Sequence, residues 1–163
     1  MNFTLGYLSF NSTFFLVDMS YEKKDITVLP EATDAFGRLN WRVYCRYCEE
    51  GEAGLMESLG FPPMYFYKKY GISFPRRAAY FEYFSQISPE NLIDIKTEVK
   101  KVGTTSLTLI HTLHKKNRTD MKPILAATAE VTIVAYKHDA YMKTELPIEL
   151  VDALKRLGIK KKD

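Results

Sequence analysis

The segment at residues 33–63 constrains the fold more than any other part of the chain, because it predicts one long helix with defined ends. Asp34 stands in front of this helix, in a turn-prone stretch that Gly37 closes. We expect the helix to run for about five turns and to end at Leu59-Gly60, since the two prolines that follow cannot continue it. The centre of the fold is therefore expected to be a single helix.

One face of the predicted helix is apolar, because the residues at spacings of three and four are Tyr44, Cys48, Gly51, Leu55 and Leu59. A glycine inside a helix costs roughly 1 kcal/mol relative to alanine. Gly51 and Gly54 therefore indicate that another element passes close to the helix, and a sheet wrapped around it is the natural candidate. A plain amphipathic core helix remains the simpler interpretation of the helix by itself.

Four strand-like segments with short polar connections follow the helix, at residues 75–85, 92–102, 104–115 and 123–136. Apolar and polar side chains alternate along them, as where Ile93, Ile95 and Thr97 share one face. In the last segment, Leu125 is expected to face the same way as Ala127. Because short turns join antiparallel neighbours, these segments predict an antiparallel sheet.

Two further elements complete the expected fold. A first strand is predicted at residues 25–32, where Pro30 places it near an edge of the sheet or marks its end. A last helix is predicted at residues 147–157, between Pro147 in its first turn and Gly158 after it. Residues 64–74 connect the long helix to the strands and could carry a short helix. The pattern predicts an α+β fold with a five-stranded antiparallel sheet against one long helix.

The junction between turn and helix carries a motif of spaced residues, D-x-x-G-x-x-N-x-x-x-Y, formed by Asp34, Gly37, Asn40 and Tyr44. It resembles the hotdog-fold acyl-CoA thioesterases, the 4-hydroxybenzoyl-CoA thioesterase-like family, in which a sheet wraps around a long central helix. The strand pattern after the helix extends the resemblance as far as Leu157. Two positions depart from the family pattern: Arg38 replaces the usual histidine, and Trp41 stands where asparagine, tyrosine or histidine is commoner.

The resemblance implies hydrolysis of an acyl-CoA to a free acid and coenzyme A. Asp34 would be the catalytic group, either as a general base for water or as a nucleophile, and the sequence leaves both routes open. The oxyanion and substrate-binding residues would be Gly37, Arg38, Asn40, Trp41 and Tyr44, with the amide near Trp41 as oxyanion donor. The coenzyme A arm would bind at a turn between strands, at Lys101, Gly103, Thr104, Thr105 and Ser106. The aromatic side chains of residues 64–74 would line the acyl cleft or pack as a lid.

The resemblance also bears on partners. No cofactor is implied, because coenzyme A is part of the substrate. A homodimer or homotetramer is expected, because a lone five-stranded sheet leaves open edges and a half-covered helix. In this family the active site typically forms between two protomers.

Other functional classes find little support in the sequence. A net charge of +3 without a basic stripe does not indicate nucleic acid as a partner. His111 and His114 lie three apart on a predicted strand and face opposite ways, and His138 is isolated, so no metal site is expected. Cys45 and Cys48 fall inside the helix, one turn apart, and are interpreted as packing residues. Nothing indicates an oxidising compartment, so the cytoplasm is expected.

The ends of the chain are expected to lie outside the domain. Residues 1–18 form a leader, which is either a product of start-site choice or an extra edge strand; its apolar run is too short to cross a bilayer. The single hotdog domain is expected at residues 19–157, and residues 158–163 form a basic tail.

Two alternative functions compete with thioester hydrolysis. A non-catalytic acyl-CoA or acyl-carrier-binding protein of the same fold is one, since a cation at Arg38 would lower the pKa of Asp34 and weaken it as a base. A dehydratase or hydratase of the same fold is the other. It is disfavoured because Leu39 stands where those enzymes carry a histidine.

Overall fold

The computed structural model describes residues 20–157. The predicted leader at residues 1–18 and the predicted basic tail at residues 158–163 lie outside the described residues.

The central helix α1, Trp41–Ser58, is 18 residues long, in agreement with the predicted five turns. It begins at Asn40, whose side chain accepts a hydrogen bond from the backbone N–H of Arg42, an ordinary N-cap. It ends where Gly60 adopts a left-handed conformation with φ 89°, which a glycine reaches without steric cost. The helix boundaries thus follow from local chemistry that is legible in the sequence.

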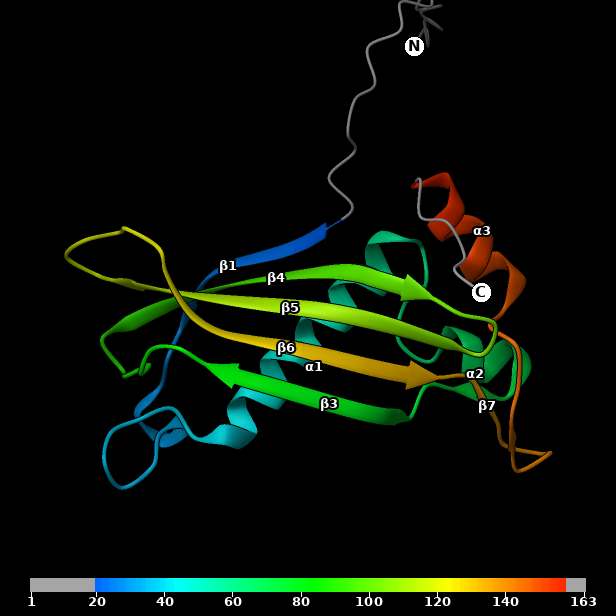
Figure 1. Cartoon of the computed structure of the whole chain (residues 1–163), viewed down its shortest axis with the longest axis horizontal. Helices are drawn as coiled ribbons and strands as arrows, with labels where there is room; N and C mark the ends of the chain where they lie inside the picture. The colour runs from blue at the N-terminus through cyan, green and yellow to red at the C-terminus, as the bar shows by residue number, and fades with distance from the viewer. Residues whose placement is uncertain (1–19, 158–163) are drawn as a thin grey trace, which may run out of the picture.

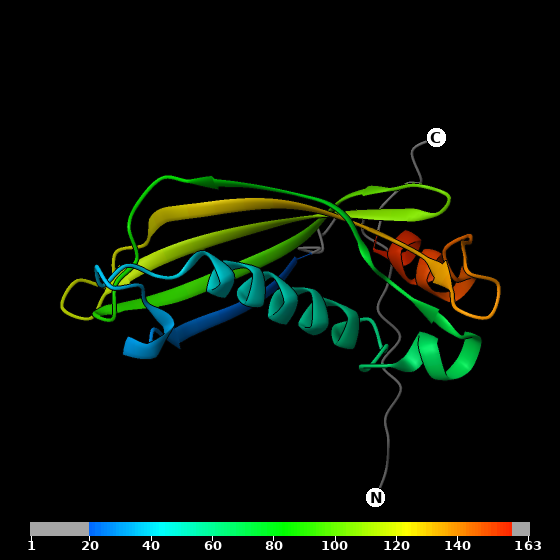
Figure 2. The ribbon, with the colours of Figure 1, turned by 90° about the horizontal axis from the view of Figure 1, so that it is seen from below.

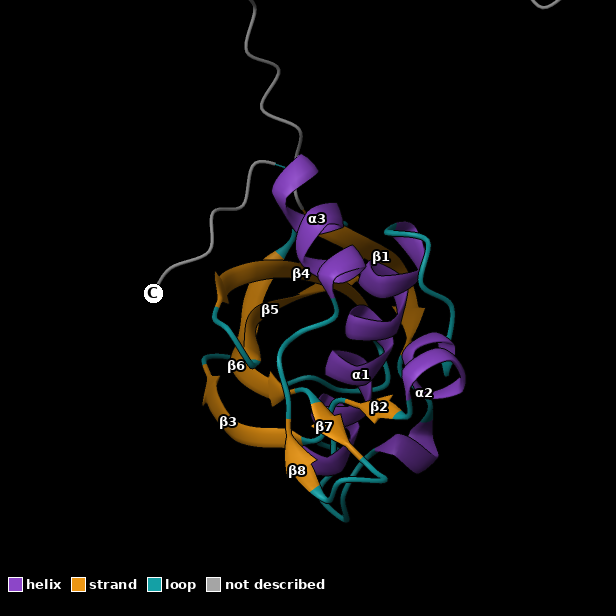
Figure 3. Ribbon diagram, turned by 90° about the vertical axis from the view of Figure 1, so that its right-hand side faces the viewer, coloured by secondary structure: helices purple, strands orange, loops and turns teal. Residues whose placement is uncertain are grey.

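One antiparallel sheet of five strands covers α1. In chain order the strands are β1 (Ser20–Thr27), β3 (Arg76–Tyr83), β4 (Asn91–Val102), β5 (Ser106–Asn117) and β6 (Ile124–Val134). Their order across the sheet is β1-β4-β5-β6-β3, as Figure 1 shows, so β1 and β3 form the two edges. Figure 2 and Figure 3 show the sheet arching over α1 and curling around it. The predicted α+β fold is confirmed.

The sheet lies close against α1 at the two helix glycines. A Cβ atom added at Gly51 would overlap the hydroxyl of Thr97 on β4, and one added at Gly54 would overlap the ring of Tyr21 on β1. The close approach that these glycines predicted is therefore present at both positions, and it explains why neither position carries a side chain.

The first strand lies earlier in the chain than the sequence predicted. Residues 25–32 were expected to form it, but β1 ends at Thr27 and Pro30–Ala32 form a 3-10 helix, η1. Asp25 adopts φ 58° at an irregularity in the pairing of β1 with β4, and its backbone N–H donates to Oδ1 of Asp94. β1 is mostly exposed, so it has no apolar alternation by which to be recognised.

A register shift also changes one inward position on β6. The pairing of β5 with β6 shifts between Leu113 and His114. Ala126 and Ala127 are fully buried, whereas Leu125, expected on the inner face, is 38% exposed. Inward and outward side chains therefore do not alternate regularly at this point of β6.

A smaller unit closes the end of the sheet beyond the C-terminus of α1. It contains a three-stranded sheet of β2 (Ile72–Ser73), β7 (Tyr136–Lys137) and β8 (Met142–Lys143), in the order β2-β7-β8. Helices α2 (Tyr65–Tyr70) and α3 (Ile148–Arg156) flank it, as Figure 3 shows, and Nζ of Lys69 joins them through an ion pair with Glu149 at 2.9 Å. α3 was predicted and α2 was allowed for, but the two-residue strands were not expected.

The buried side chains form two clusters, one under each half of α1. The first lies under the N-terminal half and includes Tyr44, Tyr47 and Ile95. The second lies under the C-terminal half and includes Leu55, Leu109 and Leu154. Within residues 20–157, no helix is long and apolar enough to cross a membrane.

Candidate active site

The loop in front of α1 is closed by its own backbone. The N–H of Asp34 donates to the carbonyl of Arg38 at 2.7 Å, and the N–H of Gly37 donates to the carbonyl of Asp34 at 3.0 Å. Gly37 has φ 71°, a conformation that favours glycine, which explains the residue at this motif position. Gly37 thus shapes the loop and does not line the cavity beside it.

The carboxylate of Asp34 uses both oxygens within this loop. Oδ1 accepts hydrogen bonds from the backbone N–H groups of Phe36, at 2.9 Å, and Arg38, at 3.1 Å. Oδ2 faces the guanidinium group of Arg38, with Nε at 3.2 Å and Nη2 at 3.1 Å. The pKa of Asp34 lies below its ordinary value, chiefly because of the backbone N–H of Arg38, and the cationic side chain of Arg38 adds a smaller effect. The group is therefore an anion at neutral pH.

The start of α1 places hydrogen-bond donors beside this carboxylate. Oδ1 of Asn40 accepts from the backbone N–H of Arg42 at 3.1 Å, which leaves Asn40 with a capping role. Trp41 is the first residue of the helix, where a backbone N–H has no acceptor within the helix. The helix dipole places partial positive charge at the same end. This end of α1 can therefore stabilise a developing oxyanion.

A cavity of about 510 Å³ opens at this junction. Five of the six predicted residues around Asp34 line it, namely Asp34, Arg38, Asn40, Trp41 and Tyr44. The other wall was not predicted and comes from the end of β3 and the segment after it, namely Tyr83, Phe84, Ser85, Gln86 and Ile87, with Leu39 between the two walls. The backbone N–H of Leu39 donates to the carbonyl of Ile87 at 2.8 Å and holds the two walls together.

Two aromatic side chains face each other in the interior of this cavity, and a third stands at its edge. The ring of Tyr44 is buried and packs edge-on against Tyr83, with centroids 4.9 Å apart. Burial raises the pKa of Tyr44 to about 12, so its hydroxyl stays protonated and can donate. Trp41 is 67% exposed and stands at the rim. The signal that could have found Tyr83 is its place at the end of an edge strand rich in aromatic residues.

The predicted coenzyme A turn lies at the other end of the sheet. Asp34 sits near the start of β4, because Leu39 bonds to Ile87, whereas Gly103, Thr104 and Thr105 follow the end of β4. A strand of 12 residues spans roughly 35–40 Å. The carbonyls of Thr104 and Thr105 accept from Leu146 and Ala135, so the segments before α3 and β7 cover part of this turn. A single chain does not bring the two predicted groups together.

A second, larger cavity of about 670 Å³ lies at this far end, beside the C-terminal half of α1. Its walls are mostly aromatic and aliphatic, including Met56, Phe61, Tyr65, Phe66, Ile72 and Phe74. Several belong to residues 64–74, whose aromatic side chains were expected to line the acyl cleft or form a lid. None of its lining residues lines the cavity at Asp34.

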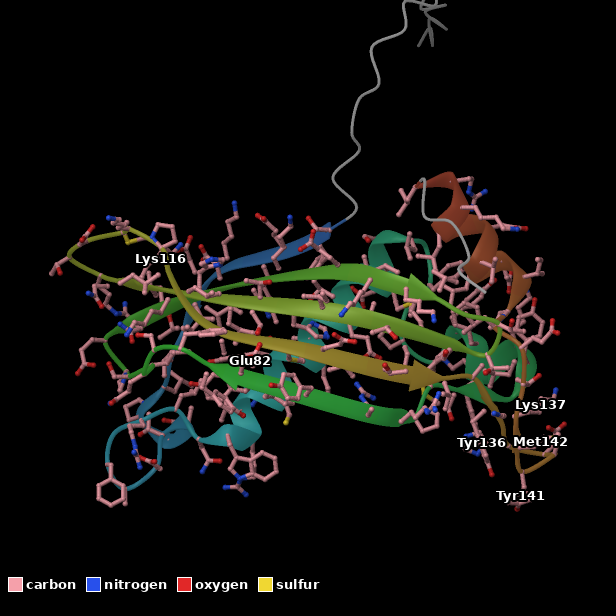
Figure 4. All side chains as sticks on the ribbon, viewed as in Figure 1. Glu82, Lys116, Tyr136, Lys137, Tyr141 and Met142 are labelled. Carbon is pink, nitrogen blue, oxygen red and sulfur yellow. The ribbon has the colours of Figure 1, made fainter. Side chains whose placement is uncertain are left out.

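Two polar groups stand in the walls of the larger cavity. Nη2 of Arg76 contacts Glu52 at 3.0 Å and Glu49 at 3.6 Å, which joins the start of β3 to α1. Oγ of Ser73 lies 2.8 Å from Nε2 of His138. Figure 4 shows Tyr136 and Lys137, the residues before His138, at the opposite end of the molecule from Lys116.

Two other side chains considered for chemistry, Cys48 and His111, are buried in the core. Cys48 is buried, and burial raises its thiol pKa to about 12, which makes it unreactive at neutral pH. His111 is fully buried, with Nδ1 2.9 Å from Oγ1 of Thr97. Among residues 20–157, no three histidine, cysteine or acidic side chains gather closely enough to hold a metal ion.

The fold is shared with solved thioesterase structures. The 4-hydroxybenzoyl CoA thioesterase from Pseudomonas sp. strain CBS-3 is 17% identical, with a TM-score of 0.75 over 82% of this chain and 98% of that chain. DHNA-CoA thioesterase from Staphylococcus aureus is 19% identical, with a TM-score of 0.72 over 85% of this chain and 89% of that chain. A hypothetical protein from Staphylococcus aureus in complex with CoA is 14% identical, with a TM-score of 0.72 over 89% of this chain and 86% of that chain.

The sequence itself identifies the family. A comparison with curated proteins found no match. A family model described as the thioesterase-like superfamily matches residues 28–154, which is most of the chain and nearly the whole span over which the motif and strand pattern resemble hotdog thioesterases. The chain belongs to the thioesterase-like superfamily.

Proposed function

We propose that this protein is an acyl-CoA thioesterase that hydrolyses the thioester at the junction of Asp34 and α1. The observation that supports this most is the placement of an ionised carboxylate beside the N-terminus of a long helix, at the mouth of a cavity. Thioester hydrolysis needs both an anion that activates or attacks and donors that stabilise the oxyanion. Family membership and the solved CoA thioesterases of the same fold support the same assignment.

Asp34 would act by one of two routes. As a general base it removes a proton from water while the water oxygen attacks the thioester carbon. As a nucleophile its carboxylate attacks that carbon directly, and water then cleaves the mixed anhydride. In both routes the carbonyl oxygen becomes an oxyanion near the amide of Trp41, and the C–S bond breaks to release coenzyme A. The hydroxyl of Tyr44, protonated because its pKa is raised, is a further donor in the cavity.

The second candidate is a non-catalytic protein that binds acyl-CoA or an acylated carrier. The contacts of Asp34 favour it: two backbone N–H groups hold Oδ1 and the guanidinium group of Arg38 holds Oδ2. A carboxylate so fully engaged, with a lowered pKa, is a weak base. For catalysis, Arg38 must therefore release or share Oδ2 when substrate binds, which its 53% side-chain exposure permits.

A panel of acyl-CoA thioesters separates the two candidates. Purified protein is mixed with short, branched, long-chain and aromatic acyl-CoAs, and a thiol reagent follows the release of coenzyme A. A thioesterase turns over at least one of them many times per chain. A binder retains acyl-CoA in equilibrium dialysis without releasing thiol. The residues predicted for coenzyme A, at positions 101–106, are then tested by Lys101→Ala, which should raise KM more than it lowers kcat if this turn binds coenzyme A.

A further inference from the structure

Of the two carboxylate oxygens of Asp34, Oδ2 is the one left for chemistry, and the side chain of Arg38 covers it. Oδ1 is held by the backbone N–H groups of Phe36 and Arg38, at 2.9 Å and 3.1 Å, which are contacts of the loop itself. Oδ2 accepts from Nε of Arg38 at 3.2 Å and lies 3.1 Å from its Nη2. An oxygen held in this way can neither take a proton from water nor attack a carbonyl carbon. Both proposed routes therefore require the side chain of Arg38 to move.

The side chain of Arg38 can move while its backbone stays in place. Its N–H donates to Oδ1 of Asp34 and its carbonyl accepts from the N–H of Asp34, so the backbone is part of the loop. The side chain is 53% exposed, and its guanidinium carbon lies 4.9 Å from the ring centroid of Phe36, which is itself 79% exposed. An exposed ion pair of this kind is weak. The guanidinium group can therefore leave Asp34 without disturbing the loop that positions the carboxylate.

The contact with Asp34 uses only part of what the guanidinium group can offer. Both Nε and Nη2 of Arg38 are directed at one oxygen, whereas the strongest arginine–carboxylate pairs place two parallel hydrogen bonds on two oxygens. Asp34 does not form such a pair, because the loop backbone already holds its Oδ1. A second carboxylate with both oxygens free can form it. Such a carboxylate is therefore a better partner for Arg38 than Asp34 is.

The walls of the cavity offer an entering anion one cation, which is Arg38. Of the residues that line this cavity of about 510 Å³, Asp34 and Arg38 are the charged ones, and they pair with each other. A neutral acyl group leaves that pair intact, whereas an acyl group with its own carboxylate can replace Asp34 as the partner of Arg38. The phosphates of coenzyme A are separated from the thioester by the whole pantetheine arm, so they do not reach Arg38 while the thioester carbon lies at Asp34.

We infer that Arg38 covers Asp34 in the resting protein and uncovers it for an acyl group that carries its own carboxylate, so that the substrates are CoA thioesters of dicarboxylic acids. This inference rests on the proposed thioesterase function and gives that function a substrate class. The distal carboxylate binds the guanidinium group, and Oδ2 of Asp34 then faces the thioester.

The same exchange makes Asp34 a stronger base. The backbone N–H of Arg38 continues to lower the pKa of Asp34, but the smaller effect of the cationic side chain is lost, so the pKa rises partway towards its ordinary value. The residue itself also matters. The histidine usual at this position of the family pattern is largely neutral at pH 7, whereas arginine is always a cation. The departure at Arg38 thus gives this chain a permanent positive charge beside the thioester.

Matched pairs of acyl-CoAs test the substrate class in the wild-type protein. Glutaryl-CoA and pentanoyl-CoA have acyl chains of equal length and differ by a terminal carboxylate, as do adipoyl-CoA and hexanoyl-CoA. Thiol release is corrected for uncatalysed hydrolysis, because a dicarboxylic thioester can attack its own carbonyl. In at least one pair, kcat/KM for the dicarboxylic member should be higher by about tenfold or more. A smaller ratio in both pairs overturns the inference.

Substitutions of Arg38 test whether it covers Asp34. Arg38→Met keeps both backbone donors and leaves Oδ2 uncovered, so the preference should disappear, and kcat with pentanoyl-CoA should be at least that of the wild type. Arg38→Lys should keep part of the preference, because an ammonium group still pairs with a carboxylate. Arg46→Met is the matched control and should keep the wild-type ratio, because Arg46 is a cation on the exposed face of α1, outside the cavity, paired with Glu50.

Two results with these variants overturn the inference. A preference that persists in Arg38→Met shows that another group reads the carboxylate. A kcat with pentanoyl-CoA that falls in Arg38→Met as far as kcat with glutaryl-CoA shows that Arg38 takes part in hydrolysis itself. Circular dichroism checks that each variant is folded, and if Arg38→Met is not, the matched pairs with the wild type and Arg38→Lys decide. Absence of turnover in the wild type with every acyl-CoA is a different outcome, which removes the proposed function and with it this inference.

Discussion

The guanidinium group of Arg38 contacts Oδ2 of Asp34 through both Nε, at 3.2 Å, and Nη2, at 3.1 Å. Arg38 is also one of the two residues at which the motif departs from the family pattern. Its larger effect on Asp34 comes from its backbone N–H, which any residue other than proline would supply at this position. The departure therefore changes the charge beside Asp34 while it leaves the shape of the loop intact.

Replacement of Arg38 by methionine should shift the acid limb of the pH–rate profile. Asp34 must be ionised to act, and its pKa lies below the ordinary value, so wild-type kcat/KM should persist into moderately acidic solution. Arg38→Met removes the cation but keeps both backbone donors, so the limb should move partway to higher pH. Arg42→Met, in the first turn of α1, is the control. An identical acid limb in Arg38→Met and the wild type would count against Asp34 as the titrating group.

His111 should make the protein less stable in acid. Burial lowers its pKa to about 4, and the positive charge of Arg76 adds to this, whereas the unfolded chain has a histidine pKa of about 6.5. Above pH 6.5 both states are neutral and His111 contributes no pH dependence. As the pH falls from about 6.5 to about 4 the unfolded state binds the proton first, so the free energy of unfolding should drop by about 3 kcal/mol.

Urea unfolding at pH 7, 5.5 and 4 measures this slope. His111→Gln should flatten it, because no proton is then taken up on unfolding at this position. His114→Gln, on the other face of β5, should keep the wild-type slope. Equal slopes in all three proteins would show that burial does not depress the pKa of His111.

Gly51→Ala should destabilise the protein more than Gly54→Ala. At Gly51 the new methyl meets the hydroxyl of Thr97, which is buried and bonded to His111, so the contact cannot relax outward. At Gly54 it meets Tyr21, on the edge strand, whose ring can swing away. The destabilisation from overpacking at Gly51, about 1–3 kcal/mol, should exceed the stabilisation of about 1 kcal/mol that alanine brings over glycine in a helix. Equal midpoints of denaturant unfolding for the two variants would be inconsistent with this packing.

Ala79→Pro should prevent dimerisation while the single chain stays folded. The N–H of Phe84 donates to the carbonyl of Ala126 on β6, and N–H groups alternate sides along a strand, so the N–H of Ala79 faces the open edge of β3. The proline ring removes this N–H, through which an edge-paired dimer would bond, and no hydrogen bond to β6 is lost. Light scattering should show the wild type as a dimer, or as a tetramer built from two dimers, and the variant as a monomer of about half the dimer mass. Circular dichroism should remain native, and Ala79→Ser should still dimerise. A dimeric Ala79→Pro protein would place the interface elsewhere.

The sequence predicted those parts of the fold that carry periodic or local signals. α1 was predictable because its cap, its apolar face and its terminal prolines lie within one short segment, and β4 to β6 were predictable because they alternate. β1 was misplaced because an exposed edge strand has no apolar face, and Val28 and Leu29 beyond it suggested a later strand. β2, β7 and β8 are only two residues long and have no period to detect.

The candidate site was likewise predictable from the sequence only in part. The residues around Asp34 are neighbours in sequence, so one loop and one helix cap bring them together. Tyr83 and Phe84, at the end of β3, complete the cavity from positions far along the chain from Asp34, and only the fold brings them there. The turn at residues 101–106 could be placed between two strands, but the end of the sheet at which it lies depends on topology that a motif does not encode.

The turnover of Asp34→Asn tests the central claim most directly. Asparagine keeps the shape and its Oδ1 can still accept from Phe36 and Arg38, but it can neither take up a proton nor attack a carbonyl carbon. Asp120→Asn is the matched control, because Asp120 holds a similar turn by accepting from the N–H of Lys122, outside both cavities. With the best acyl-CoA of the panel, kcat of Asp34→Asn should fall by at least about 10²-fold while that of Asp120→Asn is unchanged. Near-wild-type hydrolysis by Asp34→Asn would contradict the account and leave Asp34 as a residue of the loop alone.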